Sequence, residues 1–167
     1  MSQISRNGGS TWQVTDTFLY SRNGKSHAFD VAADSAGNVY VAGFGNKSVN
    51  QWFVRRGTNG GTKWSTADQF SLASGAAAEA RGITVDASNT VHVTGKASST
   101  QTNWVTRQRA AATGTWSTTD LFSLAPNGTT AGNSITADPS GNLFAAGYGA
   151  DSAGALHGWI VRRKPAP

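Results

Sequence analysis

One spacing recurs along the whole chain. A tryptophan occurs every 52 residues, at Trp12, Trp64 and Trp116. Other residue types keep the same interval: Asp16, Asp68 and Asp120; Phe18, Phe70 and Phe122; Asp34, Asp86 and Asp138; Gly43, Gly95 and Gly147. A fixed period of this length is typical of repeat proteins, in which one supersecondary unit is copied. We therefore expect one domain over residues 1–167, built from repeats 12–63, 64–115 and 116–167.

The composition favours strands and turns over helices. The 167 residues include 20 glycines, one methionine and no cysteine, and they are rich in Thr, Ser and Val, which suit strands and turns. We expect an all-β fold. The lack of cysteine excludes a disulfide scaffold, a thiol nucleophile and a Cys-ligated zinc site.

Charge and hydropathy narrow the classes of partner. The formal net charge of +5 comes from 14 basic and 9 acidic residues. The basic residues are spread over all three repeats, so they do not indicate a nucleic-acid partner. No apolar run reaches 18 residues, and the first residues lack the apolar core of a signal peptide. We expect a soluble protein with no membrane partner and no signal peptide in this chain, in a compartment that stays unassigned.

Each repeat contains four strand-like runs separated by turn residues. In the first repeat they cover residues 12–19, 28–33, 39–43 and 52–56. The turn between the second and third runs begins with an aspartate in every repeat and continues with Gly or Asn, where a positive φ is needed. The run 39–43 is apolar on both sides, which predicts a strand packed on both faces. Four such strands every 40 to 50 residues are typical of a β-propeller blade.

A polar turn motif precedes the recurrent tryptophan. Residues 5–12 read Ser-Arg-Asn-Gly-Gly-Ser-Thr-Trp, residues 57–64 are a weaker copy, and residues 113–116 keep only Thr-Gly-Thr-Trp. The motif resembles the Asp box, Ser-x-Asp-x-Gly-x-Thr-Trp, of sialidase-type and related bacterial repeat β-propellers, with Asn7 where the family has aspartate. The resemblance implies that the box is a structural turn, on the face of the propeller away from the active centre. Structural roles are therefore expected for Asn7, Gly9, Thr11, Trp12, Asn59, Gly61, Trp64, Thr115 and Trp116, and for the turn residues Asp34, Asp86 and Asp138.

The polar residues do not suggest an active site. Six of the nine acidic residues occupy repeat positions, which leaves Asp30, Glu79 and Asp151, and the sequence assigns none of these a Tyr or Arg partner. Glycosidases need a paired acid and base, and sialidases need an arginine cluster with a tyrosine nucleophile. The histidines lack metal-ligand spacing. We expect no enzyme, no catalytic residue, no metal site and no cofactor.

The loops opposite the box turns vary in length and carry aromatic and basic side chains. They supply the candidate ligand-binding residues Trp52, Trp104, Trp159, Phe44, Tyr148 and Lys96. Aromatic rings beside polar groups suit a pyranose, so carbohydrate is the favoured ligand class. The alternative is that the three tryptophans pack between blades. The arginines three residues after each tryptophan, Arg55, Arg107 and Arg162, are expected at solvated strand ends. The alternative is that oligomerisation arranges them as a ring of positive charge.

Three blades are too few to close a ring, because known propellers have about four or more. In this interpretation the strand at residues 12–19 lacks a preceding neighbour, and the strand that ends the third repeat lacks a following one. Exposed strand edges seek partners. We therefore predict a head-to-tail homodimer that closes six blades, in which the first strand of each chain completes the last blade of the other. A homotrimer of nine blades is the second choice.

These features favour a non-catalytic, self-assembling β-propeller scaffold or binding module with a lectin-like preference for carbohydrate. One alternative is an excised, reconstructed or engineered fragment of a larger propeller, whose only activity is folding and oligomeric assembly. A remnant of a glycoside hydrolase is a further alternative.

Overall fold

The computed structural model describes residues 2–154 and 157–166, and these ranges contain thirteen β-strands and no helix. No part of the described chain could therefore cross a membrane as a helix. The expectation of an all-β fold is confirmed. The strands are β1 (Ser2–Ile4), β2 (Gln13–Asp16), β3 (Ser26–Ala33), β4 (Val39–Asn46), β5 (Asn50–Thr58), β6 (Lys63–Phe70), β7 (Ala78–Val85), β8 (Val91–Ser98), β9 (Thr102–Arg109), β10 (Trp116–Phe122), β11 (Thr129–Ala137), β12 (Leu143–Ala150) and β13 (His157–Lys164).

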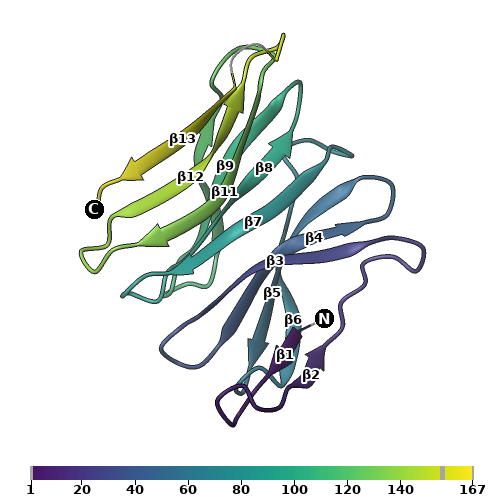
Figure 1. The fold of residues 1–167 in the computed structure, drawn as a ribbon, viewed down its shortest axis with the longest axis vertical. Helices are drawn as coiled ribbons and strands as arrows, with labels where there is room; N and C mark the ends of the chain where they lie inside the picture. The colour runs from purple at the N-terminus through teal and green to yellow at the C-terminus, as the bar shows by residue number, and fades with distance from the viewer. Residues whose placement is uncertain (1, 155–156, 167) are drawn as a thin grey trace.

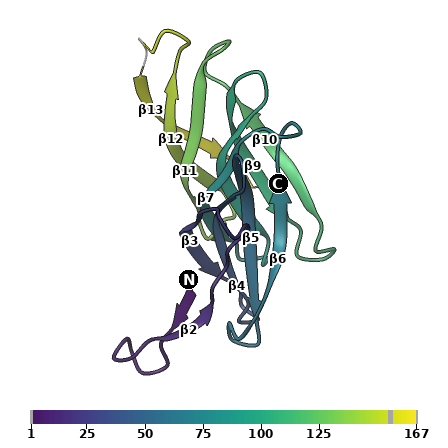
Figure 2. The same cartoon turned by 90° about the vertical axis from the view of Figure 1, so that its right-hand side faces the viewer.

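The strands after β2 form three blade-like antiparallel sheets (Figure 1). Sheet 1 contains β3 to β6, sheet 2 contains β7 to β10, and sheet 3 contains β11 to β13; a single parallel bridge from Thr129 to Thr102 joins sheets 3 and 2. The first strands of the sheets, β3, β7 and β11, are neighbours at the middle of the molecule (Figure 1). The outer strands β6 and β10 lie on the side away from them (Figure 2). The described residues form an open arc of sheets, and no closed ring is present.

The N-terminal strand is paired, contrary to the prediction that residues 12–19 lack a neighbour. β2 is hydrogen-bonded to β1, with Ser2 opposite Asp16 and Ile4 opposite Gln13. β2 is also shorter than predicted, because β1 offers it only three residues to pair with. The other runs of the first repeat become longer strands than the alternation pattern predicted.

The turns between the first two strands of each sheet have the predicted aspartate at their start. In sheet 1 the Asp34 carboxylate accepts hydrogen bonds from the backbone N–H groups of Ala36 and Asn38 and from the Asn38 side chain. Burial alone would raise the pKa of Asp34, but these hydrogen bonds outweigh it and hold the pKa below its usual value. Asp86 and Asp138 accept equivalent bonds from the residues of their own turns.

The box-like turn before β2 is held by its short polar side chains. Asn7 Oδ1 accepts from the backbone N–H of Thr11 at 2.9 Å, and Ser5 Oγ accepts from that of Gly9 at 2.8 Å. Gly9 has a φ of 90°, which a side chain would make unfavourable. Trp12 is largely exposed, whereas Trp64 packs on Gly57 and donates its indole N–H to Gly61. The first of the three recurrent rings therefore lacks the packing of the second.

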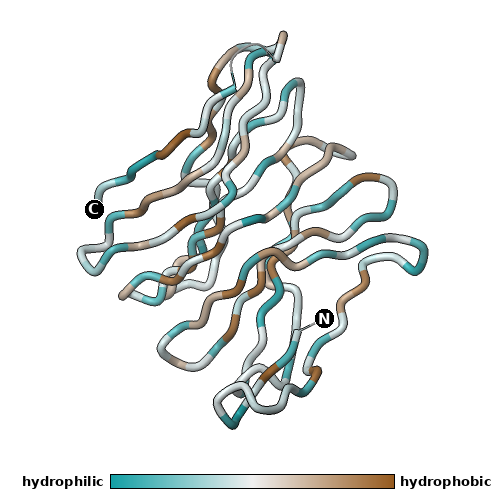
Figure 3. The backbone as a smooth tube through the Cα atoms, in the orientation of Figure 1, coloured by the Kyte–Doolittle hydropathy of each residue, from teal (hydrophilic) through white to brown (hydrophobic). Residues whose placement is uncertain are grey.

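The core lies between consecutive sheets. Between sheets 1 and 2 it includes Trp52, Val54, Ile83 and Val93, and between sheets 2 and 3 it includes Trp104, Ile135 and Ala145. Apolar stretches accordingly occur in strands of all three sheets and not in one central layer (Figure 3). Each inner sheet face is buried only because the next sheet covers it.

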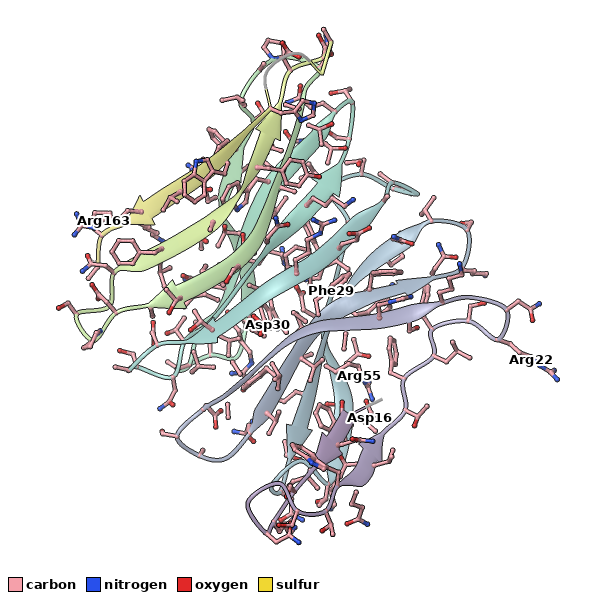
Figure 4. The ribbon with its side chains drawn as sticks, in the orientation of Figure 1. Asp16, Arg22, Phe29, Asp30, Arg55 and Arg163 are labelled. Carbon is pink, nitrogen blue, oxygen red and sulfur yellow. The ribbon has the colours of Figure 1, made fainter. Side chains whose placement is uncertain are left out.

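The recurrent arginines join neighbouring sheets, so the prediction that they sit at solvated strand ends was wrong. Arg107 on β9 forms two hydrogen bonds, of 2.8 and 3.0 Å, with Asp68 on β6 of the preceding sheet, and its guanidinium lies 4.2 Å from the ring centre of Phe70. Arg55 pairs in the same way with Asp16, beside Phe18, and Arg162 pairs with Asp120, beside Phe122. The Arg55–Asp16 pair attaches β2 to sheet 1 (Figure 4).

Candidate functional site

A hollow opens at the middle of the molecule, where the first strands of the sheets meet. It has a volume of about 550 Å³ and is lined by Phe29, Asp30, Arg81, Asn133 and Ser134. Figure 4 places Phe29 and Asp30 on β3, next to β7. We call it the axial hollow.

A β-bulge at the same repeat position aims three of these residues into the axial hollow. Each first strand has one unpaired extra residue, which is Phe29 in β3, Arg81 in β7 and Asn133 in β11. Bulges reorient a side chain and are common beside functional sites. The backbone of the three strands is repeated here, while the side chains are an aromatic ring, a guanidinium and an amide. The sequence analysis missed Phe29 and Asn133; comparing the repeats position by position for a change of chemistry would have found them.

A buried carboxylate anchors the basic residues beside the axial hollow. Glu79 accepts hydrogen bonds from Asn50 at 2.7 Å and from Arg81 at 3.0 and 3.2 Å, and its oxygen lies 3.4 Å from the Lys96 ammonium. Arg81 also donates to Asn133 across to β11, at 2.7 Å. Sequence reasoning left Glu79 without an arginine partner, and this was wrong, because the partner lies only two residues away on the same strand. Burial would raise the pKa of Glu79, but the donors and positive charges outweigh it and lower the pKa.

The structure buries some of the predicted ligand-binding residues and leaves others exposed. Trp52 and Trp104 are 0% exposed, so their rings pack between sheets and cannot stack on a sugar; for these two the alternative interpretation holds. Trp159 is 90% exposed. Phe44 stacks on His27 with ring centres 4.9 Å apart and contacts Phe29 at 5.7 Å, which brings an aromatic group to the rim of the axial hollow. Lys96 lies at the Glu79 cluster. Tyr148 is half-buried on β12, opposite Trp159.

The two end faces of the arc expose apolar side chains at repeat positions that are buried on the inner faces. On sheet 1, Val31 is 61% exposed, while Ile83 and Ile135 at the same repeat position are 4% and 6% exposed. On sheet 3, Trp159 and Val161 are exposed, while their counterparts Trp52 and Val54 are fully buried. We call these the sheet 1 end face and the sheet 3 end face.

The site that each buried tryptophan contacts on the next sheet also repeats, and we call such a site a seat. The Trp52 ring lies against Gly95 of the next sheet, and the Trp104 ring lies against Gly147. The matching glycine on sheet 1 is Gly43, and its nearest described neighbours are backbone atoms of β3. Gly43 lines a small pocket together with Phe18 and Arg55. The sheet 1 end face therefore has a glycine at the position of the other two seats, with a small pocket beside it.

Comparison with known proteins identifies the fold but not a family. No protein-family model matches the chain, and no curated protein matches it. Among solved structures, it resembles an α-L-arabinanase of Penicillium chrysogenum complexed with arabinobiose, with a TM-score of 0.55 and 12% identity over 83% of this chain and 46% of that one.

It also resembles a GH93 α-L-arabinofuranosidase of Fusarium graminearum complexed with arabinobiose, with a TM-score of 0.53 and 11% identity over 83% of this chain and 45% of that one. A protein of unknown function from Dyadobacter fermentans has a TM-score of 0.57 and 14% identity over 90% of this chain and 54% of that one. The chain spans about half the length of these structures. At such identities the likeness concerns the fold alone, and it supports an all-β, propeller-like architecture.

Proposed function

We propose that the chain is a non-catalytic, self-assembling β-propeller module, in which the sheet 3 end face of one copy packs on the sheet 1 end face of another. The observation that carries this proposal is the exposure of Val31 and Trp159 at positions that are buried in both other repeats. Exposed apolar patches rimmed by polar residues are typical of interaction sites.

The contacts inside the chain provide the template for the contact between copies. Trp159 of one copy would enter the seat at Gly43 of the other, as Trp52 enters the seat at Gly95. Val161 would face the trough of about 310 Å³ that is lined by Val31, Val39 and other residues of the sheet 1 end face. The same contact repeated once more closes two copies into a ring of six sheets, and such head-to-tail contacts form rings when the rotation closes.

The assembly is tested with an apolar-to-charged substitution on one end face. In light scattering after size exclusion, the wild-type chain of 17.3 kDa is expected at about twice its own mass. Val31→Glu is expected to leave a folded monomer, because it costs little on an exposed site but puts an unpaired charge into both interfaces of the ring. We expect the dissociation constant to rise at least about 100-fold. This corresponds to about 1.4 kcal/mol at each of the two interfaces, because 1.4 kcal/mol changes a dissociation constant tenfold.

Leu121→Glu is the matched control. Leu121 is 53% exposed but lies on β10, the outer strand of sheet 2, away from both end faces. It should leave the dimer intact. A wild-type monomer, or a Val31→Glu variant that still dimerises, would contradict the proposed interface. A mass of about three chains would keep the interface and replace the ring of six sheets by one of nine.

Carbohydrate binding at the axial hollow is a second candidate function, favoured by the placement of Phe29, Arg81 and Asn133 on three aligned bulges. An exposed ring covers the apolar face of a sugar, while guanidinium, amide and carboxylate groups bond its hydroxyls. The arabinobiose bound by two structural neighbours provides one probe, and a glycan array provides the others. The lowered pKa of Glu79 does not suit a general acid, which needs a raised pKa, and so favours a binding role for this carboxylate.

Calorimetry with the saccharides that the array selects tests this second function. Phe29→Ala is expected to weaken binding about fivefold, since an aromatic contact contributes on the order of 1 kcal/mol. Trp12→Ala removes an exposed ring that is not part of the hollow's lining and should leave affinity unchanged. Equal loss in both variants, or no saccharide binding at all, would argue against a sugar site in the axial hollow.

A further inference from the structure

The short strand β1 occupies a repeat position that a much longer strand holds in the other sheets. Ser2, Gln3 and Ile4 stand opposite Asp16, Val14 and Gln13. In sheet 1, Val54, Arg55 and Arg56 stand opposite Asp68, Thr66 and Ser65. Each residue number in the β5–β6 pairing is 52 higher than its counterpart in the β1–β2 pairing, and the register shift falls at the same place. β1 is therefore a three-residue counterpart of β5, in the register of the repeat.

β13 is the sheet 3 counterpart of β5, and it ends the described part of its sheet. Its Arg162 occupies the position of Arg55, because Ile160 stands opposite Gly147 as Phe53 stands opposite Gly43. Because the assembly proposed above continues the repeat, β13 of a second copy would pair with β2 as β5 pairs with β6. The repeat register then puts Val161 opposite Asp16, Arg162 opposite Val14 and Arg163 opposite Gln13. These are the partners that β1 now has.

One edge of β2 can hold only one strand, so the two pairings exclude each other. β2 itself is attached to sheet 1 independently of β1: Asp16 pairs with Arg55 at 3.2 Å, and Phe18 packs on Phe53 with ring centres 5.0 Å apart. β2 therefore keeps its place when β1 leaves. β1 also covers part of the sheet 1 end face, since Ser2, Gln3 and Ile4 line the trough beside Val31.

Resting on the proposed assembly, we propose that the β1-facing edge of β2 is the docking edge for β13 of a second copy, and that β1 is a placeholder which β13 displaces. The displacement is favoured because β13 has eight residues against three in β1. It also buries Trp159 and Val161, which are exposed in the single chain. Hydrogen bonds lost from β1 are replaced in the longer ladder.

A reversible covalent lock tests the displacement. The chain has no cysteine, so Ile4→Cys with Gln13→Cys introduces the only two thiols, in facing residues of β1 and β2. Facing residues of an antiparallel pair are about 4.5–5.5 Å apart, which suits a disulfide. Oxidised, this variant is expected to be a monomer in light scattering, and reduction should restore the dimer. The control is Arg56→Cys with Ser65→Cys, the same pair one repeat later, whose mass should not respond to oxidation.

Deletion of residues 1–4 provides the second measurement. Removing the competitor should lower the dissociation constant of the dimer about tenfold, as three ladder residues no longer have to be displaced. An oxidised lock that still dimerises, or a deletion that leaves the dissociation constant unchanged, would overturn the placeholder role while the Val31-dependent dimer stands. If the full chain, the reduced variant and the deletion variant are all monomers, the proposed assembly itself is wrong.

Discussion

Asp68→Ala is expected to lower the free energy of unfolding by about 3–5 kcal/mol, the cost of removing one partner of a buried ion pair. The Asp68 and Arg107 side chains are only 6% and 11% exposed, and they share two hydrogen bonds across the boundary between sheets 1 and 2. Without the carboxylate, the Arg107 guanidinium keeps Thr118 and the face of Phe70 as partners, but its charge stays buried and unpaired. Urea unfolding at one fixed protein concentration measures the change.

The repeat provides the matched control for this prediction. Asp120 and Arg162 form the same pair between sheets 2 and 3, but their side chains are 34% and 31% exposed in the single chain. An ion pair in contact with water contributes about 0–1 kcal/mol, so Asp120→Ala should cost about 1 kcal/mol or less under conditions where the protein is monomeric. Equal costs at Asp68 and Asp120 would show that burial does not set the strength of these pairs.

Gly132→Ala is expected to cost about 2–3 kcal/mol, at the upper part of the range for overpacking a core. A β-carbon on Gly132 would overlap Thr94 Oγ1 and the indole of Trp104. These two groups are hydrogen-bonded to each other and fully buried, so neither can move away without losing that bond. The glycine is needed here for close approach between sheets 2 and 3 and not for its backbone freedom. Thermal and urea unfolding both report the loss.

The equivalent positions at the boundary between sheets 1 and 2 carry a different pair of residues, and they provide the control. Ala42 stands where Thr94 stands one repeat later, and Ala80 stands where Gly132 stands. With no hydroxyl at Ala42, the buried Trp52 indole N–H has no hydrogen-bond partner among the described residues. Ala42→Thr alone should destabilise by crowding Ala80, and adding Ala80→Gly should recover the loss by giving Trp52 its acceptor. Additive effects of the two changes would contradict this coupling.

The spacing of Trp, Asp, Phe and Gly predicted an all-β chain of repeated strands and turns, because each repeat has its own turn residues and alternating strands, and such signals are local. The pairing of Arg107 with Asp68 was not visible in the same way. The partners are 39 residues apart and belong to different sheets. The constant offset between the arginine and aspartate series, 39 residues for the first two pairs, was a signal that could have been used.

The axial hollow is a second feature that could not be predicted from the sequence. Phe29, Arg81 and Asn133 carry no shared motif, and an extra residue in one strand is invisible until the pairing register of its neighbour is known. The strand pairing decides that these three side chains converge.

The sequence by itself determined an all-β chain of three like units with turns at defined places, since propensity and alternation are local properties of each repeat. Only the tertiary structure decided which of the like residues are buried. Trp52, Trp104 and Trp159 share one register, yet the first two are buried and the third is exposed, because a following sheet covers only the first two. Burial is a property of the neighbouring sheet, and equal residues in a repeat differ when their neighbours do.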